Sequence, residues 1–291
     1  MTSVDLALLR RSDAIRGVGV ILAASLMFGS MAVCVRLATA EMPALQVAFV
    51  RFVGSLAVLL AATRGRNLQP RPGNLRRLVL RGLLGAGAIS LYYLGIGWAG
   101  AGLATLLQCT YPVSTAVIAT TLMGEPFSWR IGVALGLNLL GVLVIVGPGG
   151  AGGGQVTLGC AAALGSSILA GGAVATARHL RASENAALIT TYFMAVGAVL
   201  TAPSLLSGVS LPSPALLLAL AGVVLTSVAG QWLLHHGLGF TSATQGSVAA
   251  ATSVLTAAGL EAVTLGSSLG PHLLLGSLLM FAAIALASRS G

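Results

Sequence analysis

The sequence predicts an all-α integral membrane protein with ten transmembrane helices, arranged as two inverted five-helix repeats. Of its 291 residues, 56% are hydrophobic and only 7% are charged. The charged residues stand between long uncharged runs, and the chain resembles itself at a fixed shift. A soluble chain of this length needs more charge to cover its surface. Ten spans of about 20 residues cross the apolar core of a bilayer and leave room for short loops.

Each uncharged run predicts one or more spans. The first half holds 17–35, 43–63, two helices within 82–124 with a break near 95–102, and 130–147. The second half holds 157–178, three helices within 185–260 that are cut at 207–214 and 235–242, and 271–288. Continuous runs rich in Leu, Ala and Gly favour helices over the alternating segments of a membrane barrel. The predicted units are a first repeat at 1–147, a glycine-rich linker at 148–156 and a second repeat at 157–291.

The basic residues indicate which way the chain crosses the membrane. All 15 are arginines, and all but Arg36 and Arg51 fall in the termini or in alternate loops, six of them in the loop 64–81. Cytoplasmic loops carry such an excess of positive charge. We therefore expect a multi-pass protein of a bacterial-type cytoplasmic (inner) membrane with both termini in the cytoplasm. No basic segment interleaved with aromatic residues is present, so we expect no nucleic-acid partner.

A shift of 142 residues brings related features of the two halves together. It places Gly17 on Gly159, Gly29 on Gly171, Gly95-Ile-Gly-Trp98 on Gly237-Leu-Gly-Phe240, and Arg36 on Arg178. Because five is an odd number of spans, the second copy enters the membrane from the opposite side. Inverted repeats are typical of transporters, whose substrate site lies between the repeats near the middle of the membrane.

Two stretches of the first half resemble the EamA-type branch of the drug/metabolite transporter superfamily, and the resemblance extends over nearly the whole chain. They are LAASLMFGSMAVCVRLA at 22–38, followed by Arg51 in VAFVRFVGSLAVLL, and ATLLQCTYPVSTAVIATTLMGEPFSW at 104–129. In the second half Val254 and Ser267 stand where the shift expects Pro112 and Glu125. The resemblance implies ten helices, an inverted repeat, and export of amino acids or other small amphiphilic metabolites. Exporters of aromatic amino acids are the favoured subgroup.

Two ionisable residues lie inside predicted spans, where charge is costly and marks a candidate functional residue. Arg51 stands inside the second span, where it could hold a substrate carboxylate or bond structurally to backbone carbonyls. Glu261 is the only acid deep in a span. It is a candidate for proton coupling, with a packing role near a helix end as the alternative.

Polar and aromatic residues of the third and fourth spans predict the substrate site. Tyr92 lies in the third span, and Gln108 and Tyr111 are three residues apart on one face of the fourth. Tyrosine and glutamine supply hydrogen bonds beside apolar surface, which suits an amphiphilic ligand. Gln245, in the span that repeats the fourth, and Trp232, in the eighth, are further candidates.

Other features predict no site. We expect Trp98 to belong to an interfacial aromatic belt, and His235 and His236 to be solvated near a cytoplasmic turn. The glycines at 147–152 spell G-x-G-x-x-G, but an apolar helix precedes them instead of a strand, which favours a linker over a dinucleotide site. The four histidines show no metal-ligand spacing. We therefore expect no enzyme, no catalytic residue, no cofactor and no metal.

The sequence thus favours a transporter that exports small amphiphilic metabolites, above all aromatic or other neutral amino acids, by alternating access around a cavity at mid-membrane. One alternative is a multidrug exporter of lipophilic cations, which would use a buried acid such as Glu261. The other is a membrane-embedded enzyme. The expected partners are the small-molecule substrate and the lipid bilayer, and the oligomeric state stays open, a monomer included.

Overall fold

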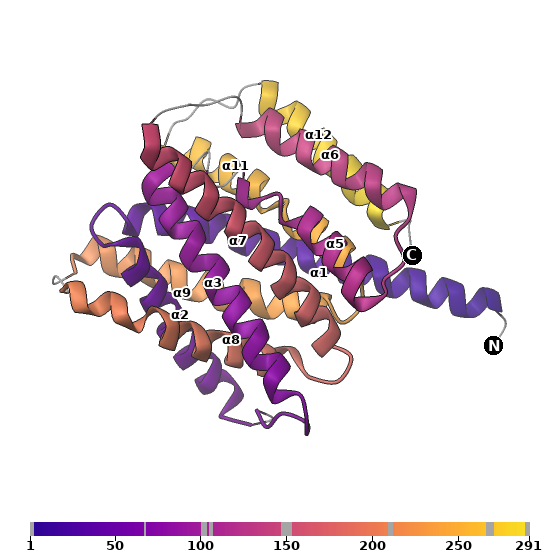
Figure 1. Ribbon diagram of the computed structural model, residues 1–291, viewed down its shortest axis with the longest axis horizontal. Coiled ribbons are helices and arrows are strands. Elements are labelled where there is room, and N and C mark those ends of the chain that lie inside the picture. Colours follow the sequence, from indigo (N-terminus) through magenta and orange to yellow (C-terminus); the bar gives the residue numbers. More distant parts are fainter. Residues whose placement is uncertain are drawn as a thin grey trace.

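Helices make up most of the chain in the computed structural model, which describes residues 3–66, 68–99, 104, 107–146, 153–208, 212–265 and 271–288 (Figure 1). No strand occurs in these ranges. The first half forms α1 (Ser3–Ala38), α2 (Ala44–Thr63), α3 (Leu75–Ala99), α5 (Tyr111–Met123) and α6 (Trp129–Val146). The second half forms α7 (Gly153–Leu180), α8 (Ala186–Thr201), the 3-10 helix η1 (Ala202–Ser207), α9 (Pro214–Gly237), α10 (Ala243–Ala250), α11 (Ser253–Leu265) and α12 (Pro271–Ser288).

The length and surface of the helices confirm the prediction of an all-α membrane protein. In the part of the chain that the structure describes, α1, α2, α3, α7, α9 and the continuous segment of α8 and η1 are long and apolar enough to cross a bilayer, and α5, α6 and α12 contain shorter apolar helices. Large apolar side chains point outward, among them Leu122, Val199 and Leu218, which are each more than three-quarters exposed. Water disfavours so much exposed apolar surface, whereas lipid does not.

Two helices begin at other residues than the sequence predicts. α3 begins at Leu75, so the loop predicted at 64–81 ends earlier, because Arg76 and Arg77 fit the exposed face of a first helical turn. α7 begins at Gly153, within the predicted linker. Residues 147–152 lie outside the described residues, so the extent of that linker stays a prediction.

One end of the bundle, which we call the arginine-rich end, joins the turns at 64–74, 124–128, 180–185 and 238–243. The Glu184 carboxylate accepts hydrogen bonds from the Arg71 amide at 2.8 Å and from Asn74 Nδ2 at 2.7 Å. The Glu125 carboxylate accepts one from the Ala243 amide at 3.1 Å. These bonds place the turns at 64–74 and 180–185 on the same side, as the inverted arrangement requires.

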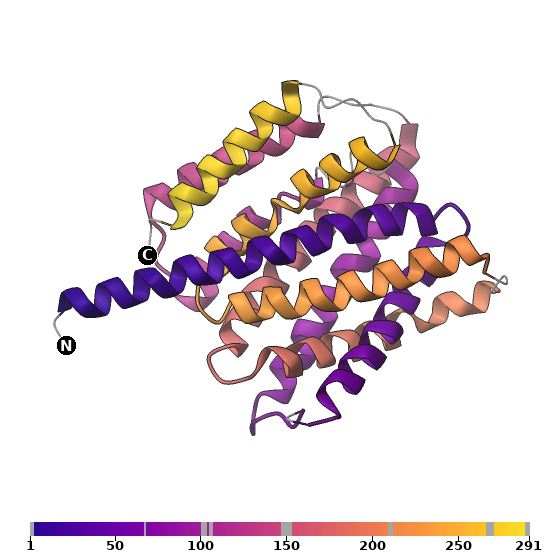
Figure 2. The ribbon, with the colours of Figure 1, turned by 180° about the vertical axis from the view of Figure 1, so that it is seen from behind.

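The opposite end is joined by a second set of bonds. Gln46 Nε2 donates to the Gly208 carbonyl at 2.7 Å, and Ser213 Oγ lies 3.0 Å from a carboxylate oxygen of Glu41. α7 therefore runs toward the arginine-rich end. α1 runs away from it, since the Arg16 guanidinium lies 5.2 Å from the Phe240 ring centroid. The first helix of each half thus crosses in the opposite direction, and in Figure 2 the N-terminal turns of α1 extend beyond the bundle.

Glycines related by the 142-residue shift make equivalent contacts. A Cβ on Gly95 of α3 would lie 3.2 Å from the Gly159 carbonyl of α7, and one on Gly237 of α9 would lie 2.8 Å from the Gly17 carbonyl of α1. Small residues let helix backbones approach this closely. Glycines that the shift relates therefore lie at contacts between the halves, where α3 packs on α7 and α9 packs on α1.

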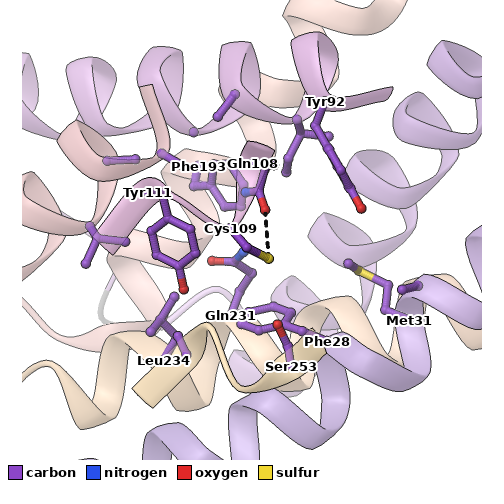
Figure 3. A pocket seen from close by; sticks show the side chains of 18 of the residues that line it. Phe28, Met31, Tyr92, Gln108, Cys109, Tyr111, Phe193, Gln231, Leu234 and Ser253 are labelled. Carbon is purple, nitrogen blue, oxygen red and sulfur yellow. Dashed lines mark hydrogen bonds between the residues drawn. The ribbon is translucent and has the colours of Figure 1, made fainter. Parts of the chain in front are cut away.

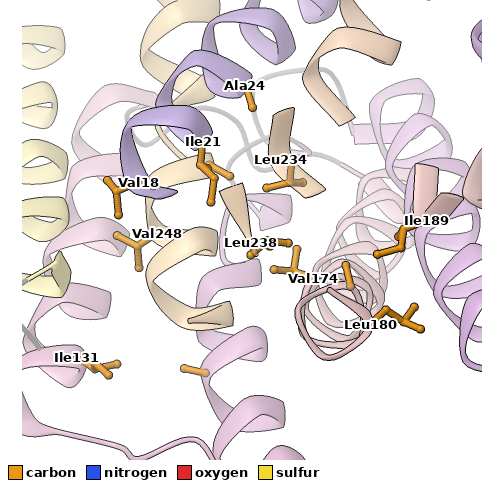
Figure 4. Packing of buried hydrophobic residues seen from close by; sticks show 14 of the residues in the cluster. Val18, Ile21, Ala24, Ile131, Val174, Leu180, Ile189, Leu234, Leu238 and Val248 are labelled. Carbon is orange, nitrogen blue, oxygen red and sulfur yellow. The ribbon is translucent and has the colours of Figure 1, made fainter. Parts of the chain in front are cut away.

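The main buried apolar cluster lies near the arginine-rich end (Figure 4). Its members include Val18 and Ile21 of α1, Leu180 of α7, Ile189 of α8 and Leu238 just after α9. All five are buried. Tight packing of such side chains closes this end of the bundle.

Candidate functional site

A cavity of about 190 Å³ lies between the two halves (Figure 3). Its wall comes from α1, α2, α3 and α5 of the first half and from α7, α8, α9, α10 and α11 of the second, together with Gln108 and Cys109 just before α5. Inverted repeats predict a shared site of this kind. The structure thus brings residues from both halves to one shared cavity.

Two turns interrupt helical backbone beside this cavity, at Cys109–Thr110 before α5 and at Ala251–Thr252 between α10 and α11. Thr110 Oγ1 donates to the carbonyl three residues back at 2.6 Å, and Thr252 Oγ1 does the same at 2.7 Å. Thr110 and Thr252 are related by the 142-residue shift. The fourth and ninth spans therefore carry the same interruption at equivalent positions.

A serine from the first helix of the opposite half contacts each interruption. Ser25 Oγ of α1 donates to the Ala249 carbonyl at 3.0 Å. Ser167 Oγ of α7 lies 2.8 Å from Thr110 Oγ1. Ser25 and Ser167 are buried and again 142 residues apart. Interrupted helices in transporters present backbone polar groups to the substrate. Ser25 satisfies one backbone carbonyl at its interruption, and Ser167 contacts the threonine hydroxyl at the other.

Four of the six predicted binding residues line the cavity: Arg51, Tyr92, Gln108 and Tyr111. In the view of Figure 3 the rings of Tyr92 and Tyr111 stand on either side of Gln108, whose Oε1 lies 3.9 Å from Cys109 Sγ. The Tyr111 hydroxyl donates to the Ser247 carbonyl at 3.1 Å. Tyr111 therefore joins α5 to α10, one interrupted span to the other.

Arg51 has a structural partner as well as a place in the wall. It is 2% exposed, and its Nε donates to Ser227 Oγ of α9 at 2.6 Å. Its guanidinium also lies 5.5 Å from the Phe52 ring centroid. The structural alternative for Arg51 thus has contacts in the structure, and the binding alternative keeps its position on the cavity.

The structure adds residues that the sequence did not single out. Arg81 is 3% exposed and lines the cavity, although the charge pattern assigned it to a cytoplasmic loop. His235 is fully buried, and its Nε2 lies 2.9 Å from Arg81 Nη2. The expectation of a solvated His235 is therefore wrong. Gln231 Oε1 lies 3.5 Å from the same Arg81 nitrogen, and Gln231 also lines the cavity.

Gln245 and Trp232 lie away from the cavity wall. Gln245 Oε1 accepts a hydrogen bond from Thr241 Oγ1 at 2.7 Å, and its side chain completes a capping box with Ser242 at the start of α10. Trp232 is 42% exposed and stacks on His236, with 5.5 Å between the ring centroids. Both side chains have local partners, and a direct role for either in substrate binding stays a prediction.

The charged residues of the described cavity wall are both arginines, Arg51 and Arg81. Glu261 falls in α11, but its side chain lies outside the described residues, so its role in proton coupling stays a prediction. Guanidinium groups bind carboxylates through charge-assisted hydrogen bonds, and aromatic walls hold apolar bodies. The described wall therefore suits a ligand that has both.

A bundle of apolar helices in two inverted halves, with a shared internal cavity, defines a multi-pass membrane transporter. Residues 15–147 and 157–289 each match the family model of the EamA-like transporter family. The chain belongs to this family, within the drug/metabolite transporter superfamily. Family membership points to a transporter and away from an enzyme.

Individual relatives agree with this assignment. The chain is 30% identical over 233 residues to the pseudopaline exporter CntI of Pseudomonas aeruginosa strain UCBPP-PA14, and 29% identical to the CntI protein of strain PAO1. Each alignment covers 78% of this chain and 80% of the relative. A solved crystal structure superposes with a TM-score of 0.78 over 92% of this chain and 94% of the other, at 17% identity. That likeness concerns the fold alone.

Proposed function

We propose that this chain exports small amphiphilic metabolites, first of all amino acids with aromatic or other neutral side chains, by alternating access around the shared cavity. The cavity itself carries the proposal. Its wall combines aromatic surface with the amide of Gln108, the hydroxyl of Tyr111 and two arginines, and both interrupted spans contribute to it. An apolar site with a few placed polar groups suits a zwitterion with an apolar side chain.

Export is supported by the relatives, whose names state that they export pseudopaline. The amino-acid class rests on the chemistry of the wall. A lipophilic cation is the second candidate, but it would meet Arg51 and Arg81, and like charges in an apolar site repel strongly. The positive charge of the wall therefore favours a ligand with a carboxylate over a multidrug cation.

Alternating access requires that one side of the cavity be closed while the other gives entry. On α9 the residues that line the cavity, Gln231 and Leu234, are followed by the buried Leu238 at the start of the turn at 238–243. α7 repeats the pattern, with Val174 in the wall and Leu180 in the buried cluster. The apolar cluster of Figure 4 therefore separates the cavity from the arginine-rich end, and transport requires it to part.

Alanine at Gln108 or at Tyr111 should reduce amino-acid flux into proteoliposomes while the protein still folds. Both side chains line the cavity, and Tyr111 also links the interrupted spans through Ser247. Losing one such hydrogen bond costs about 1 kcal/mol, which corresponds to a several-fold loss. Thr121→Ala is the control, because Thr121 lies on the exposed face of α5. Wild-type flux in both cavity variants would exclude these residues from the site, and no flux of any amino acid by the wild type would remove this substrate class.

We further propose a cytoplasmic membrane location with the arginine-rich end and both termini in the cytoplasm. The excess of arginine at that end supports it. In a chain whose three native cysteines are replaced by alanine, Ala40→Cys marks the opposite end and Arg66→Cys the arginine-rich end, both at exposed positions. A membrane-impermeant maleimide should label position 40 on intact cells and position 66 only after permeabilisation. The reverse pattern would contradict this orientation.

A further inference from the structure

Arg81 is a buried cation with unused hydrogen-bond donors. Its side chain is 3% exposed and lines the cavity, yet Nε and Nη1 have no hydrogen-bond partner in the described structure. A charge inside a membrane protein is costly, and buried donors without acceptors add to the cost. A protein retains such a group when a bound ligand supplies the missing hydrogen-bond acceptor and compensates the charge.

One nitrogen of the Arg81 guanidinium, Nη2, is held by the protein. Nη2 lies 2.9 Å from His235 Nε2, and because a guanidinium only donates, Nε2 accepts. The His235 proton then sits on Nδ1, which lies 2.7 Å from Thr190 Oγ1, and that hydroxyl donates to the Ala186 carbonyl at 2.8 Å. The Phe193 ring centroid lies 4.5 Å from the guanidinium carbon. Held in this way, the side chain leaves two buried donors, Nε and Nη1, without a hydrogen-bond partner in the described structure.

Gly85 makes room for Arg81 Nη1. A Cβ at position 85, one turn along α3, would lie 2.1 Å from Arg81 Nη1 and 2.7 Å from the Phe193 ring. Only a residue without a side chain allows the guanidinium to lie there. Gly85 also lines the cavity, so Arg81 Nη1 occupies the place of the missing side chain at the cavity wall.

The backbone around the cavity adds to the positive potential. α5 begins at Tyr111 and α11 begins at Ser253, and both residues line the cavity. The start of a helix carries the positive end of the helix dipole. Together with Arg81 and Arg51, these helix starts face a described wall without an acidic residue.

We propose that Arg81 binds the carboxylate of the transported metabolite through a charge-assisted hydrogen bond from one of its unpartnered donors, Nε or Nη1. The inference rests on the proposed transport function and narrows its substrates to carboxylates with an apolar body. Arg51 is the lesser candidate, because its Nε is already bonded to Ser227. His235 is a positioning residue, which holds Arg81 in place as a neutral acceptor.

Phenylalanine and 2-phenylethylamine test the inference, since they share a ring and an ammonium group and differ in the carboxylate. The wild-type chain in proteoliposomes should transport the amino acid and not the amine. In Arg81→Gln and Arg81→Lys the KM for phenylalanine should rise about tenfold or more, the loss expected for one charge-assisted pair. Gly85→Ala should act in the same direction by displacing Nη1. Arg76→Gln, an exposed arginine of α3, should behave as the wild type.

Thermal shift of the purified full chain separates this inference from the proposed function. Phenylalanine should raise the melting temperature of the wild type and of Arg76→Gln, but not of Arg81→Gln, and the amine should raise none. Equal flux and equal thermal shift for acid and amine would overturn the role of Arg81 and leave transport standing. A shift specific for the acid without any flux would leave Arg81 as a carboxylate site and overturn the transport proposal. If the Arg81 variants do not fold, the wild-type comparison of acid with amine decides.

Discussion

Alanine at Gly29 should sharply lower the thermal stability of the protein, and alanine at Gly171 should do the same. A Cβ at position 29 would lie 2.4 Å from Thr256 Cβ and 2.8 Å from the Ala257 amide nitrogen. At position 171 it would lie 2.7 Å from both Ser114 Cβ and the Thr115 amide nitrogen. Backbone atoms cannot rotate out of the way as side chains do, so the helices must separate. Overpacking of this kind costs about 1–3 kcal/mol.

The effect is expected to reach beyond stability. α1 packs on α11 at Gly29, and α7 packs on α5 at Gly171, so each glycine holds the first helix of one half against an interrupted span of the other. Both interrupted spans line the cavity. Separating either contact therefore distorts the cavity wall and should reduce flux as well.

Melting in detergent and flux in proteoliposomes measure both consequences. Gly19→Ala is the matched control on α1, because a Cβ there would meet nothing within 4 Å. It should melt at or slightly above the wild-type temperature, since alanine favours helix more than glycine does. If Gly29→Ala melted at the same temperature as Gly19→Ala, the close approach of α1 and α11 would be incorrect.

The repeat could be predicted because equivalent residues make equivalent contacts in both halves. Gly29 and Gly171 coincided at the 142-residue shift, and each lies where a helix meets an interrupted span. Thr110 and Thr252 coincide at the same shift and form the same turn. Where the fold requires a small residue or a hydroxyl at equivalent positions of both halves, the same residue type occurs in both, although the halves differ at most other positions.

The burial of Arg81 cannot be predicted from the charge pattern alone. That pattern predicts a loop up to the last arginine of the run, although the helix begins at Leu75. A helical stripe gave the missing signal: Leu78, Arg81, Gly85 and Ala88 repeat at three or four residues and are all buried. Arg76 and Arg77 fall off that stripe and are exposed. An arginine in register with apolar residues belongs to the packed face of its helix.

Gln245 shows the opposite case, in which a polar residue inside a span serves the backbone. Ser242 and Gln245 have the spacing of a capping box, and their side chains satisfy the first amides of α10. That spacing is legible in the sequence, but the start of the helix at Ala243 is not, since residues 185–260 contain no charge to mark it. Helix ends cannot be located within long uncharged runs. A residue that caps a helix therefore cannot be distinguished there from one that binds a ligand.

Methionine at Arg81 should raise the melting temperature while it abolishes carboxylate transport. The substitution keeps a long flexible side chain and removes a buried charge with two unpartnered nitrogens. It also removes the hydrogen-bond donor to His235 and to Gln231, and each lost bond costs about 1 kcal/mol at most. The loss at His235 is limited because the ring can change tautomer. Replacing a buried ion pair with apolar residues often stabilises a protein by about 1–4 kcal/mol, and a buried charge without an ionic partner is costlier still. The net gain corresponds to a few degrees, at about 2–4 °C per kcal/mol.

A purely structural arginine would give the reverse result. Arg51, with its bond to Ser227, is the internal comparison, and Arg51→Met should gain less or lose stability. Arg76→Met, at an exposed position of α3, should leave the melting temperature unchanged. Lower stability in Arg81→Met than in the wild type would show that the contacts with His235 and Phe193 already compensate the charge. If Arg81 serves to bind a ligand, its replacement should increase stability and abolish transport. The unpaired charge destabilises the protein whenever the cavity is empty.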